Sequence, residues 1–323
     1  MNNTSQNPLI SVVFTSYNHK EYLKQALDSL VNQTYQNLEI IIIDDCSTDG
    51  SQEILKEYQH LQNINLKLSD VNSGSYVNSS NLGASLATGE FILFAQCDDY
   101  AVPNQIEKLL GPFYNNINIG VVYSKSNLVD DHGTYLQDDL QGRELAFKNH
   151  IKKSPIINGN EMRKFLSFSC VIPNLSAALI KNSLFKEVGL SNQFLVVADW
   201  ELWLNFSEKT DFYYLNEPLN NFRQHATTIR SKIKIKTQIV EIFNMFYNHL
   251  NAYQLKGNDK KMIRIGAGAV LFSYFVQNKA LWLKSFFVFY YEIKKNEKSV
   301  LYYLFLGAKK HFVELFHRKF ASK

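Results

Sequence analysis

Two apolar runs of this chain end in adjacent carboxylates, and these side chains are the ones best suited to chemistry. Asp98 and Asp99 follow the run 91–95, while Asp44 and Asp45 follow the run 38–43. In an open α/β sheet, ligands bind beyond the carboxyl ends of the strands, so two such pairs line one crevice if the sheet is parallel. Carboxylate oxygens are hard ligands, and the pattern therefore predicts a site for a divalent cation that carries a phosphate.

The segments around these pairs alternate between strand-like and helix-like patterns. Helical spacing follows the first apolar run from Tyr22 to Leu30, and a helix is expected to begin after Asp49. Strands are expected at 9–14, 38–43, 64–68, 91–95 and 120–123, and further helices at 78–87, 182–188 and 199–207. This alternation predicts an α/β fold with a doubly wound, mostly parallel sheet. Residues 137–160 show no sustained period and are expected to form a loop.

Charge divides the chain into an acidic part and a basic part. Residues 1–230 hold 17 Lys and Arg against 25 Asp and Glu, a net −8, whereas residues 231–323 hold 17 against 5, a net +12. The second part is rich in Phe and Tyr and is expected to form long helices that meet an anionic surface. Three cysteines are too few for a disulfide framework, and residues 1–7 are polar, so we expect a cytoplasmic protein.

Several short motifs occur in one order between residues 9 and 230. They are residues 11–18, 29–35, 43–50, 72–74, 81–83, 87–90, 96–99, 172–174, 198–203 and 222–225. In this order they resemble the nucleotide-binding and catalytic part of glycosyltransferase family 2. The resemblance implies a GT-A fold that binds a nucleotide-sugar and a divalent metal, and a transfer that inverts the anomeric carbon. It covers residues 9–230, so a catalytic domain is expected over 1–230. No motif covers the helical extension that the sequence pattern predicts over 231–323.

The resemblance puts Asp98 on the metal, as the last carboxylate of the family's DxD motif. The first carboxylate of that motif is replaced by Gln96, which can hydrogen-bond a ribose hydroxyl but supplies no charge. A metal site with one carboxylate fewer needs another ligand, and His225 is the candidate. The expected cofactor is Mn²⁺ or Mg²⁺.

Other residues match family positions around the nucleotide. Thr15, Tyr17 and Asp45 correspond to positions that hold the nucleobase and ribose, with Tyr17 offering a stacking face. Arg223 could clamp the diphosphate, and a structural ion pair is an equally good interpretation.

Asp199 matches the family's catalytic base, which takes the proton of the acceptor hydroxyl in an inverting transfer. It also stands where a helix is expected to begin, so an ordinary capping role is the alternative. Supporting roles next to donor or acceptor are expected for five residues: Asp99, Pro173, Asn174, Trp200 and Glu201.

No transmembrane helix is expected, because the uncharged segment 265–278 is shorter than the roughly 20 residues that span a bilayer. Phe312, Phe316 and Phe320 recur every four residues among basic side chains, which is typical of a helix lying in a membrane interface. A packed helical subdomain with a basic face is the alternative. The location expected is cytoplasmic, with peripheral attachment to the inner face of the cell membrane if the tail binds lipid.

The leading hypothesis is an inverting, metal-dependent glycosyltransferase that builds a bacterial surface polysaccharide or lipooligosaccharide. Its partners would be a nucleoside-diphosphate-sugar donor and a glycan or lipid-linked glycan acceptor, not nucleic acid, for which no binding motif is present. A nucleotidyltransferase would carry a Gly-rich basic loop after the first strand, and a dinucleotide-dependent dehydrogenase a GxGxxG motif; residues 15–19 are neither. A degenerate transferase that binds without turnover stays open, because Gln96 and Ala198 replace family carboxylates.

Overall fold

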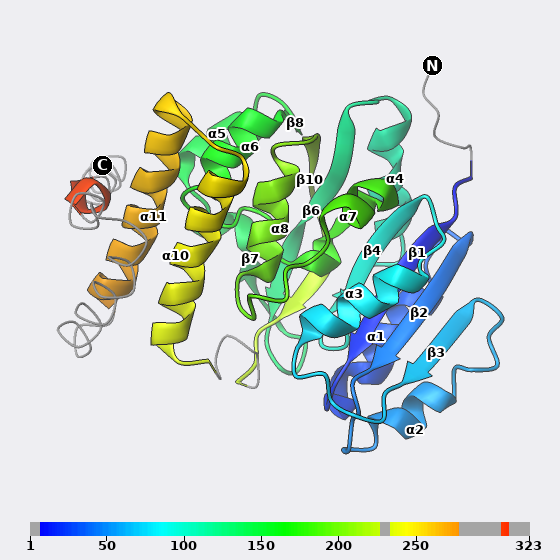
Figure 1. Cartoon of the computed structure of the whole chain (residues 1–323). Helices are drawn as coiled ribbons and strands as arrows, with labels where there is room; N and C mark the ends of the chain where they lie inside the picture. The colour runs from blue at the N-terminus through cyan, green and yellow to red at the C-terminus, as the bar shows by residue number, and fades with distance from the viewer. Residues whose placement is uncertain (1–6, 227–232, 278–304, 310–323) are drawn as a thin grey trace. The chain divides into compact units, whose positions relative to one another are not determined.

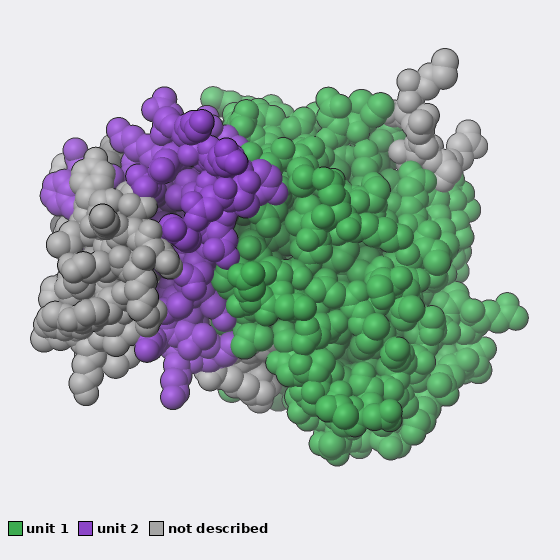
Figure 2. All heavy atoms as spheres, in the orientation of Figure 1, with its two compact units in different colours: residues 1–162, 171–226 green, residues 163–170, 227–323 purple. Residues whose placement is uncertain are grey.

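The computed structural model of the chain describes residues 7–226, 233–277 and 305–309 (Figure 1). The chain divides into two compact units, coloured separately in Figure 2: residues 1–162 with 171–226, and residues 163–170 with 227–323.

The first unit is built on a ten-stranded mixed sheet, with strands in the order β3-β2-β1-β4-β9-β6-β10-β5, while β7 pairs with β6 and β8 with β10. The longest pairings, β3-β2-β1-β4 and β6-β10, are parallel, and the antiparallel pairings of β5, β7, β8 and β9 are short. The mostly parallel α/β sheet expected from the sequence is confirmed. The strands are β1 (Ile10–Ser16), β2 (Leu38–Asp44), β3 (Ile64–Leu68), β4 (Phe91–Gln96), β5 (Tyr100–Ala101), β6 (Ile119–Val129), β7 (Tyr135–Asp138), β8 (Ile156–Ile157), β9 (Ala178–Lys181) and β10 (Asp211–Arg223).

Helices cover both faces of this sheet, because its central strands are apolar on both sides. The helices are α1 (Lys20–Val31), α2 (Ser51–Lys56), α3 (Tyr76–Leu86), α4 (Gln105–Leu110), α5 (Leu145–Ile151), α6 (Gly159–Leu166), α7 (Asn182–Val188) and α8 (Ala198–Phe206). On one face, residues of α1 and α4 share one hydrophobic cluster with alternate residues of β1 such as Val12 and Phe14. On the other face, α7 brings Phe185 against Phe94, with ring centroids 4.7 Å apart.

The segment 137–160, expected to be a loop, is structured, and that prediction is wrong. It contains the end of β7, a 3₁₀ turn at Asp139–Gly142, α5, β8 and the start of α6. Each of these elements is seven residues or fewer within the segment. They are therefore too short to show a period in the sequence, and pairing with longer neighbours stabilises them: β7 with β6, and β8 with β10.

The second unit contains two long helices, α10 (Ile235–Ala252) and α11 (Gly257–Gln277), and the long helical stretches expected beyond residue 230 are confirmed there. Arg163 is buried and forms an ion pair with Asp259 at 3.0 Å, which ties the start of α11 to residues 163–170. In the ranges the structure describes, no helix combines the length and the apolar character needed to cross a bilayer. Phe312, Phe316 and Phe320 lie outside the described residues.

Candidate active site

The acidic strand ends expected to form one crevice do meet at one edge of the sheet. β1 lies between β2 and β4 in parallel register, with Ser16 opposite Asp44 and Thr15 opposite Gln96. β10 also runs parallel to β4, because β9 is antiparallel to β4 and to β6, and β6 is parallel to β10. The residues that follow β1, β2, β4 and β10 therefore gather at the same edge.

The loops after β1 and β2 are fastened to each other. Asn18 lies in the left-handed region at φ 52°. Its side-chain Oδ1 accepts a hydrogen bond from the Thr48 backbone amide at 2.8 Å, and its backbone amide donates to the Ser47 hydroxyl at 3.0 Å. Asp49 accepts the Lys20 amide at the start of α1 at 2.9 Å. Asparagine tolerates this backbone conformation better than most residues. The loops thus fix where α1 begins.

Three side chains from different strand ends converge there: His19 before α1, Asp98 after β4 and His225 after β10. Their ligand atoms all lie within 4.8 Å of one another. Nε2 of His225 is 3.0 Å from Oδ2 of Asp98, and the two imidazole rings meet edge to face at 5.3 Å. The side chain of His225 is 3% exposed and that of Asp98 is 19% exposed, so solvent reaches the cluster from the aspartate side. Two imidazoles and a carboxylate are a donor set that fits a divalent cation.

Asp99 points away from this cluster into a buried polar network. Its carboxylate accepts hydrogen bonds from Asn174 Nδ2 at 2.5 Å, the Ser176 hydroxyl at 3.0 Å and the Arg223 amide at 3.1 Å. Burial raises the pKa of the Asp99 carboxyl well above its usual range, and the nearby charge of Asp98 raises this pKa further. Asp99 and Asn174 thereby join the end of β4 to the 3₁₀ turn at Leu175–Ala177 and to β10.

Arg223 is 2% exposed, and its guanidinium is held by protein acceptors. Nε donates to the Asp98 carbonyl at 2.9 Å, Nη1 to the Asp131 carbonyl at 2.8 Å, and Nη2 to Gln25 Oε1 at 2.7 Å. The guanidinium carbon also lies 4.5 Å from the centroid of the Tyr22 ring. This arrangement favours a role for Arg223 in positioning the backbone at Asp98 over a clamp on a diphosphate. Its acceptors are backbone carbonyls and a side-chain amide, not the carboxylate that a structural ion pair would need.

The three residues expected at the nucleoside differ in exposure. Tyr17 is 46% exposed, Thr15 is 8% exposed and Asp45 is 5% exposed. Asp45 accepts the Ser73 amide at 2.8 Å and the Ser73 hydroxyl at 2.9 Å, which fastens the loop 72–74 to the end of β2. Tyr17 therefore presents an open aromatic face beside a fixed carboxylate.

The expected base, Asp199, lies in the first turn of α8 and is half-buried. Its Oδ1 accepts the Trp200 amide at 2.8 Å. Trp200 and Glu201 are both 8% exposed, and burial raises the pKa of Glu201 from 4.5 to about 7, while a hydrogen bond with Ser191 opposes that rise. Pro173 is half-buried, directly before Asn174 of the Asp99 network.

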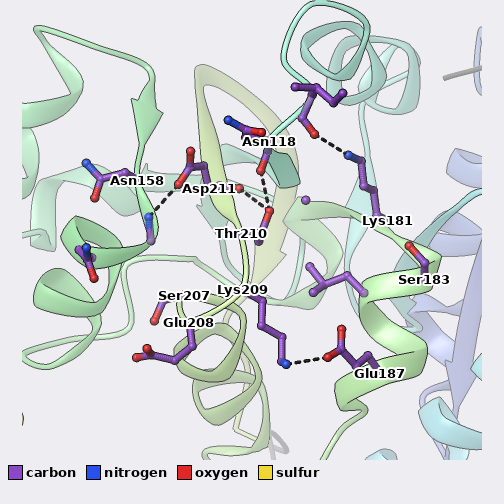
Figure 3. A pocket seen from close by; sticks show the side chains of 15 residues that line it. Asn118, Asn158, Lys181, Ser183, Glu187, Ser207, Glu208, Lys209, Thr210 and Asp211 are labelled. Carbon is purple, nitrogen blue, oxygen red and sulfur yellow. Dashed lines mark hydrogen bonds and ion pairs between the residues drawn. The ribbon is translucent and has the colours of Figure 1, made fainter. Parts of the chain in front are cut away.

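A second hollow of about 710 Å³ lies at the opposite edge of the sheet, where β6 and β10 begin and β9 ends. Figure 3 shows Lys209 and Glu187 pointing toward each other, with an ion pair of 2.7 Å, and Thr210 donating to the Asn118 carbonyl at 2.8 Å. Asp211 accepts the Gly159 amide at 3.0 Å. These side chains stabilise the connections between elements, and the hollow is separate from the Asp98 cluster.

Comparison with known proteins identifies the family. The profile described as "Glycosyl transferase family 2" matches residues 11–188, which is more than half of the chain. The chain belongs to glycosyltransferase family 2. Glycosyltransferase GlyG of Streptococcus pneumoniae is 29% identical over 264 residues, covering 80% of this chain and 84% of GlyG. A putative teichuronic acid biosynthesis glycosyltransferase of Bacillus subtilis, TuaG, is 30% identical over 155 residues, covering 48% of this chain and 61% of TuaG.

Solved structures confirm the GT-A fold of this family 2 enzyme. Staphylococcus aureus TarS 1-349, crystallised with UDP-GlcNAc, superposes with a TM-score of 0.66 at 17% identity, covering 96% of this chain and 92% of that one. The mannosyltransferase PcManGT of Pyrobaculum calidifontis, in complex with GDP-Man and Mn²⁺, gives a TM-score of 0.54 at 13% identity, covering 95% and 88%. The chain is therefore a glycosyltransferase, as the motifs predicted.

One member of the cluster, His19, was missed from the sequence. It stands four residues after Thr15, just beyond the end of β1, which is the strand beside β4. The rule that located Asp98, a polar residue just past the carboxyl end of a strand, applies equally to His19.

Proposed function

We propose that this glycosyltransferase is an inverting, metal-dependent enzyme that moves a hexosyl or N-acetylhexosaminyl group from a nucleoside-diphosphate-sugar to a glycan or lipid-linked glycan acceptor. The observation that carries the proposal is the convergence of Asp98 and His225, 3.0 Å apart, at the strand edge where Tyr17 offers an exposed ring. The carboxylate and the imidazole suit a cation bound to a diphosphate, and the aromatic face suits the base of the same nucleotide.

Asp98 and His225 would hold a divalent cation such as Mn²⁺ or Mg²⁺, and a bound cation would stabilise the negative charge that develops on the leaving diphosphate. The protein prepares this position through Asp99 and Arg223, which anchor the backbone of residues 98 and 99 from β10 and the 3₁₀ turn. Thr15, Asp45 and Gln96 would hold the nucleoside, with Tyr17 stacked on the base. Preformed hydrogen bonds lower the cost of reorganisation during transfer.

Asp199 would act as the base on the far side of the sugar. Its carboxylate would take the acceptor hydroxyl proton while that oxygen bonds to the anomeric carbon and the bond to the diphosphate breaks. Oδ1 accepts the Trp200 amide, which orients the carboxylate, and Oδ2 would take the proton in this proposal. Pro173, Asn174, Trp200 and Glu201 would shape the wall beside donor and acceptor.

The name of TuaG supports a cell-surface polysaccharide as the product, and the ligands crystallised with TarS and PcManGT support a UDP- or GDP-linked donor. We place the catalytic domain in residues 1–230 and assign the basic extension 231–323 to peripheral contact with the inner face of the membrane. A membrane-bound acceptor would explain a net charge of +12 in that extension.

The test is release of nucleoside diphosphate by the purified full-length chain from a panel of UDP-, GDP- and dTDP-sugars with Mn²⁺. We expect one donor to be turned over and Asp199→Asn to lower the rate by at least 10³-fold, because the amide cannot take a proton. Asp211→Asn is the matched control, since Asp211 lies at the opposite edge of the sheet beside the Gly159 amide.

A binding-only, degenerate transferase is the competing function, and Gln96 and Ala198 favour it. It predicts that a donor raises the melting temperature while no diphosphate is released with any glycan acceptor supplied. Equal rates for the wild type and Asp199→Asn would also contradict the proposed base.

A further inference from the structure

We propose that His19 is a third ligand of the cation site and that it compensates for the carboxylate missing at Gln96. This inference deepens the proposed function, since it assigns the donor set of the same site. A set of two imidazoles and one carboxylate prefers Co²⁺, Zn²⁺ and, to a lesser degree, Mn²⁺ over Mg²⁺, which favours oxygen ligands. The site would therefore select its metal differently from a carboxylate pair.

Distance supports His19 as a ligand. The ligand atoms of His19, Asp98 and His225 lie within 4.8 Å of one another, and ligands bound about 2.1 Å from one cation are separated by at most about 4.2 Å. Small rotations of the side chains would therefore bring all three onto one ion. The three residues come from separate segments, so this proximity is a product of the fold rather than of neighbouring positions.

The surroundings of His19 hold the ring in place. The Cys97 thiol lies 3.6 Å from His19 Nδ1, and the rings of Tyr22 and His225 flank the imidazole with centroids at 6.1 Å and 5.3 Å. The His19 carbonyl also accepts the amides of Tyr22 and Leu23 at 3.0 and 3.2 Å, which fixes the backbone at the start of α1. Contacts of this kind orient a metal-binding histidine and raise affinity.

Gln96 is placed differently. It is half-buried and lines a small cavity of about 10 Å³ together with Asp99, Ser176 and Asn220, all members or neighbours of the buried polar network. Its amide is neutral. The fold thus supplies the third ligand of the cation from the loop before α1 rather than from β4.

The experiment measures metal binding directly, without a donor or acceptor. CoCl₂ and MgCl₂ are titrated into the metal-free full-length chain by calorimetry, and the visible absorption of bound Co²⁺ reports its nitrogen ligands. We expect His19→Ala to weaken Co²⁺ binding at least tenfold and to change the Co²⁺ spectrum, while Mg²⁺ binding changes less than twofold. His132→Ala is the control, because the His132 side chain is 86% exposed.

A second variant, His19→Gln, guards against loss of the fold, since it keeps a polar side chain at the start of α1 while removing the imidazole. The inference is overturned if the variant with native circular dichroism binds Co²⁺ with the wild-type affinity and spectrum. Failure of the proposed function has a different signature: no donor is turned over, yet Co²⁺ binding still depends on His19, Asp98 and His225.

Discussion

Asp98 shows what a single residue's sequence context can reveal. The apolar run before it predicts its place at a strand end, and the carboxylate missing at Gln96 indicates His225 as a second ligand beside it. The contacts that prepare it could not be read in the same way, because the partners of Asp99 come from positions 174, 176 and 223, far along the chain. Sequence spacing contains no information on which of many polar residues meet across a fold, so it does not separate the two interpretations of Arg223, a diphosphate clamp and a structural ion pair.

The burial of Glu201 makes the stability of the fold depend on pH. Its pKa is raised from 4.5 to about 7 by burial, so the folded state binds a proton that the unfolded state releases between these values. The free energy of unfolding contributed by this group is therefore greatest below pH 4.5, falls as the pH rises to about 7 and is constant above it. The Glu201→Gln variant cannot ionise at this position and should not show this loss. The free energy of unfolding of the variant minus that of the wild type should therefore be about 2–3 kcal/mol larger at pH 8 than at pH 4.5.

Urea unfolding followed by tryptophan fluorescence at pH 4.5, 6 and 8 measures the difference. Glu53→Gln, an exposed substitution on α2, serves as the control for loss of a carboxylate. A Glu201→Gln curve parallel to that of the wild type would show that Glu201 is ionised in the folded protein without a penalty.

Strands with a clear apolar pattern were predictable even at five or six residues, as β3 and β4 show, whereas the 13-residue β10 was not, because polar residues interrupt it. β1 to β4 match the expected strands within two residues, because β1, β2 and β4 are apolar runs buried on both faces and β3 alternates apolar and polar residues. By contrast, α5 and β8 have seven and two residues, and their conformation depends on neighbours that the local sequence does not specify. The proximity of His19 to Asp98 also depends on the pairing of β1 with β4, which the local sequence does not specify.

The packing of α3 on the sheet depends on a close contact at Gly83. A Cβ at Gly83 would lie 2.4 Å from Val13 Cγ1 in β1 and 3.3 Å from Ile43 Cγ1 in β2. Gly83→Ala must therefore push α3 off both strands, and it should lower the free energy of unfolding by about 1–3 kcal/mol although alanine is the better helix former. Chemical denaturation measures the change.

Gly142→Ala is the matched control for Gly83. Gly142 ends the 3₁₀ turn at Asp139–Gly142, outside the left-handed region, and has open space around the added Cβ. Alanine should be neutral there or stabilise by up to about 1 kcal/mol, because it restricts the unfolded chain. If both variants lost stability equally, backbone entropy or helix capping rather than contact with β1 would govern the effect at Gly83.

The separation of charge along the whole chain is not explained by the catalytic chemistry. Residues 231–323 carry a net +12 and residues 1–230 a net −8, and charges that served only to keep the chain in solution would not need to be separated in this way. Anionic lipids attract basic side chains near their surface by about 1 kcal/mol each. An acceptor held in a membrane would give the extension a direct use.

The full-length chain should therefore bind vesicles of 30% phosphatidylglycerol and should dissociate when salt is raised from 50 to 500 mM, since such attraction is screened. Removing four charges near the C-terminus should weaken binding by more than tenfold, because four contributions of about 1 kcal/mol are lost. The substitutions are Lys309→Gln, Lys310→Gln, Arg318→Gln and Lys319→Gln.

A matched variant removes four exposed lysines of the catalytic part: Lys56→Gln, Lys67→Gln, Lys152→Gln and Lys186→Gln. Co-sedimentation with phosphatidylcholine vesicles sets the background. Equal weakening by both fourfold variants would mean that binding follows total charge, and the extension would then have no special part in meeting the membrane.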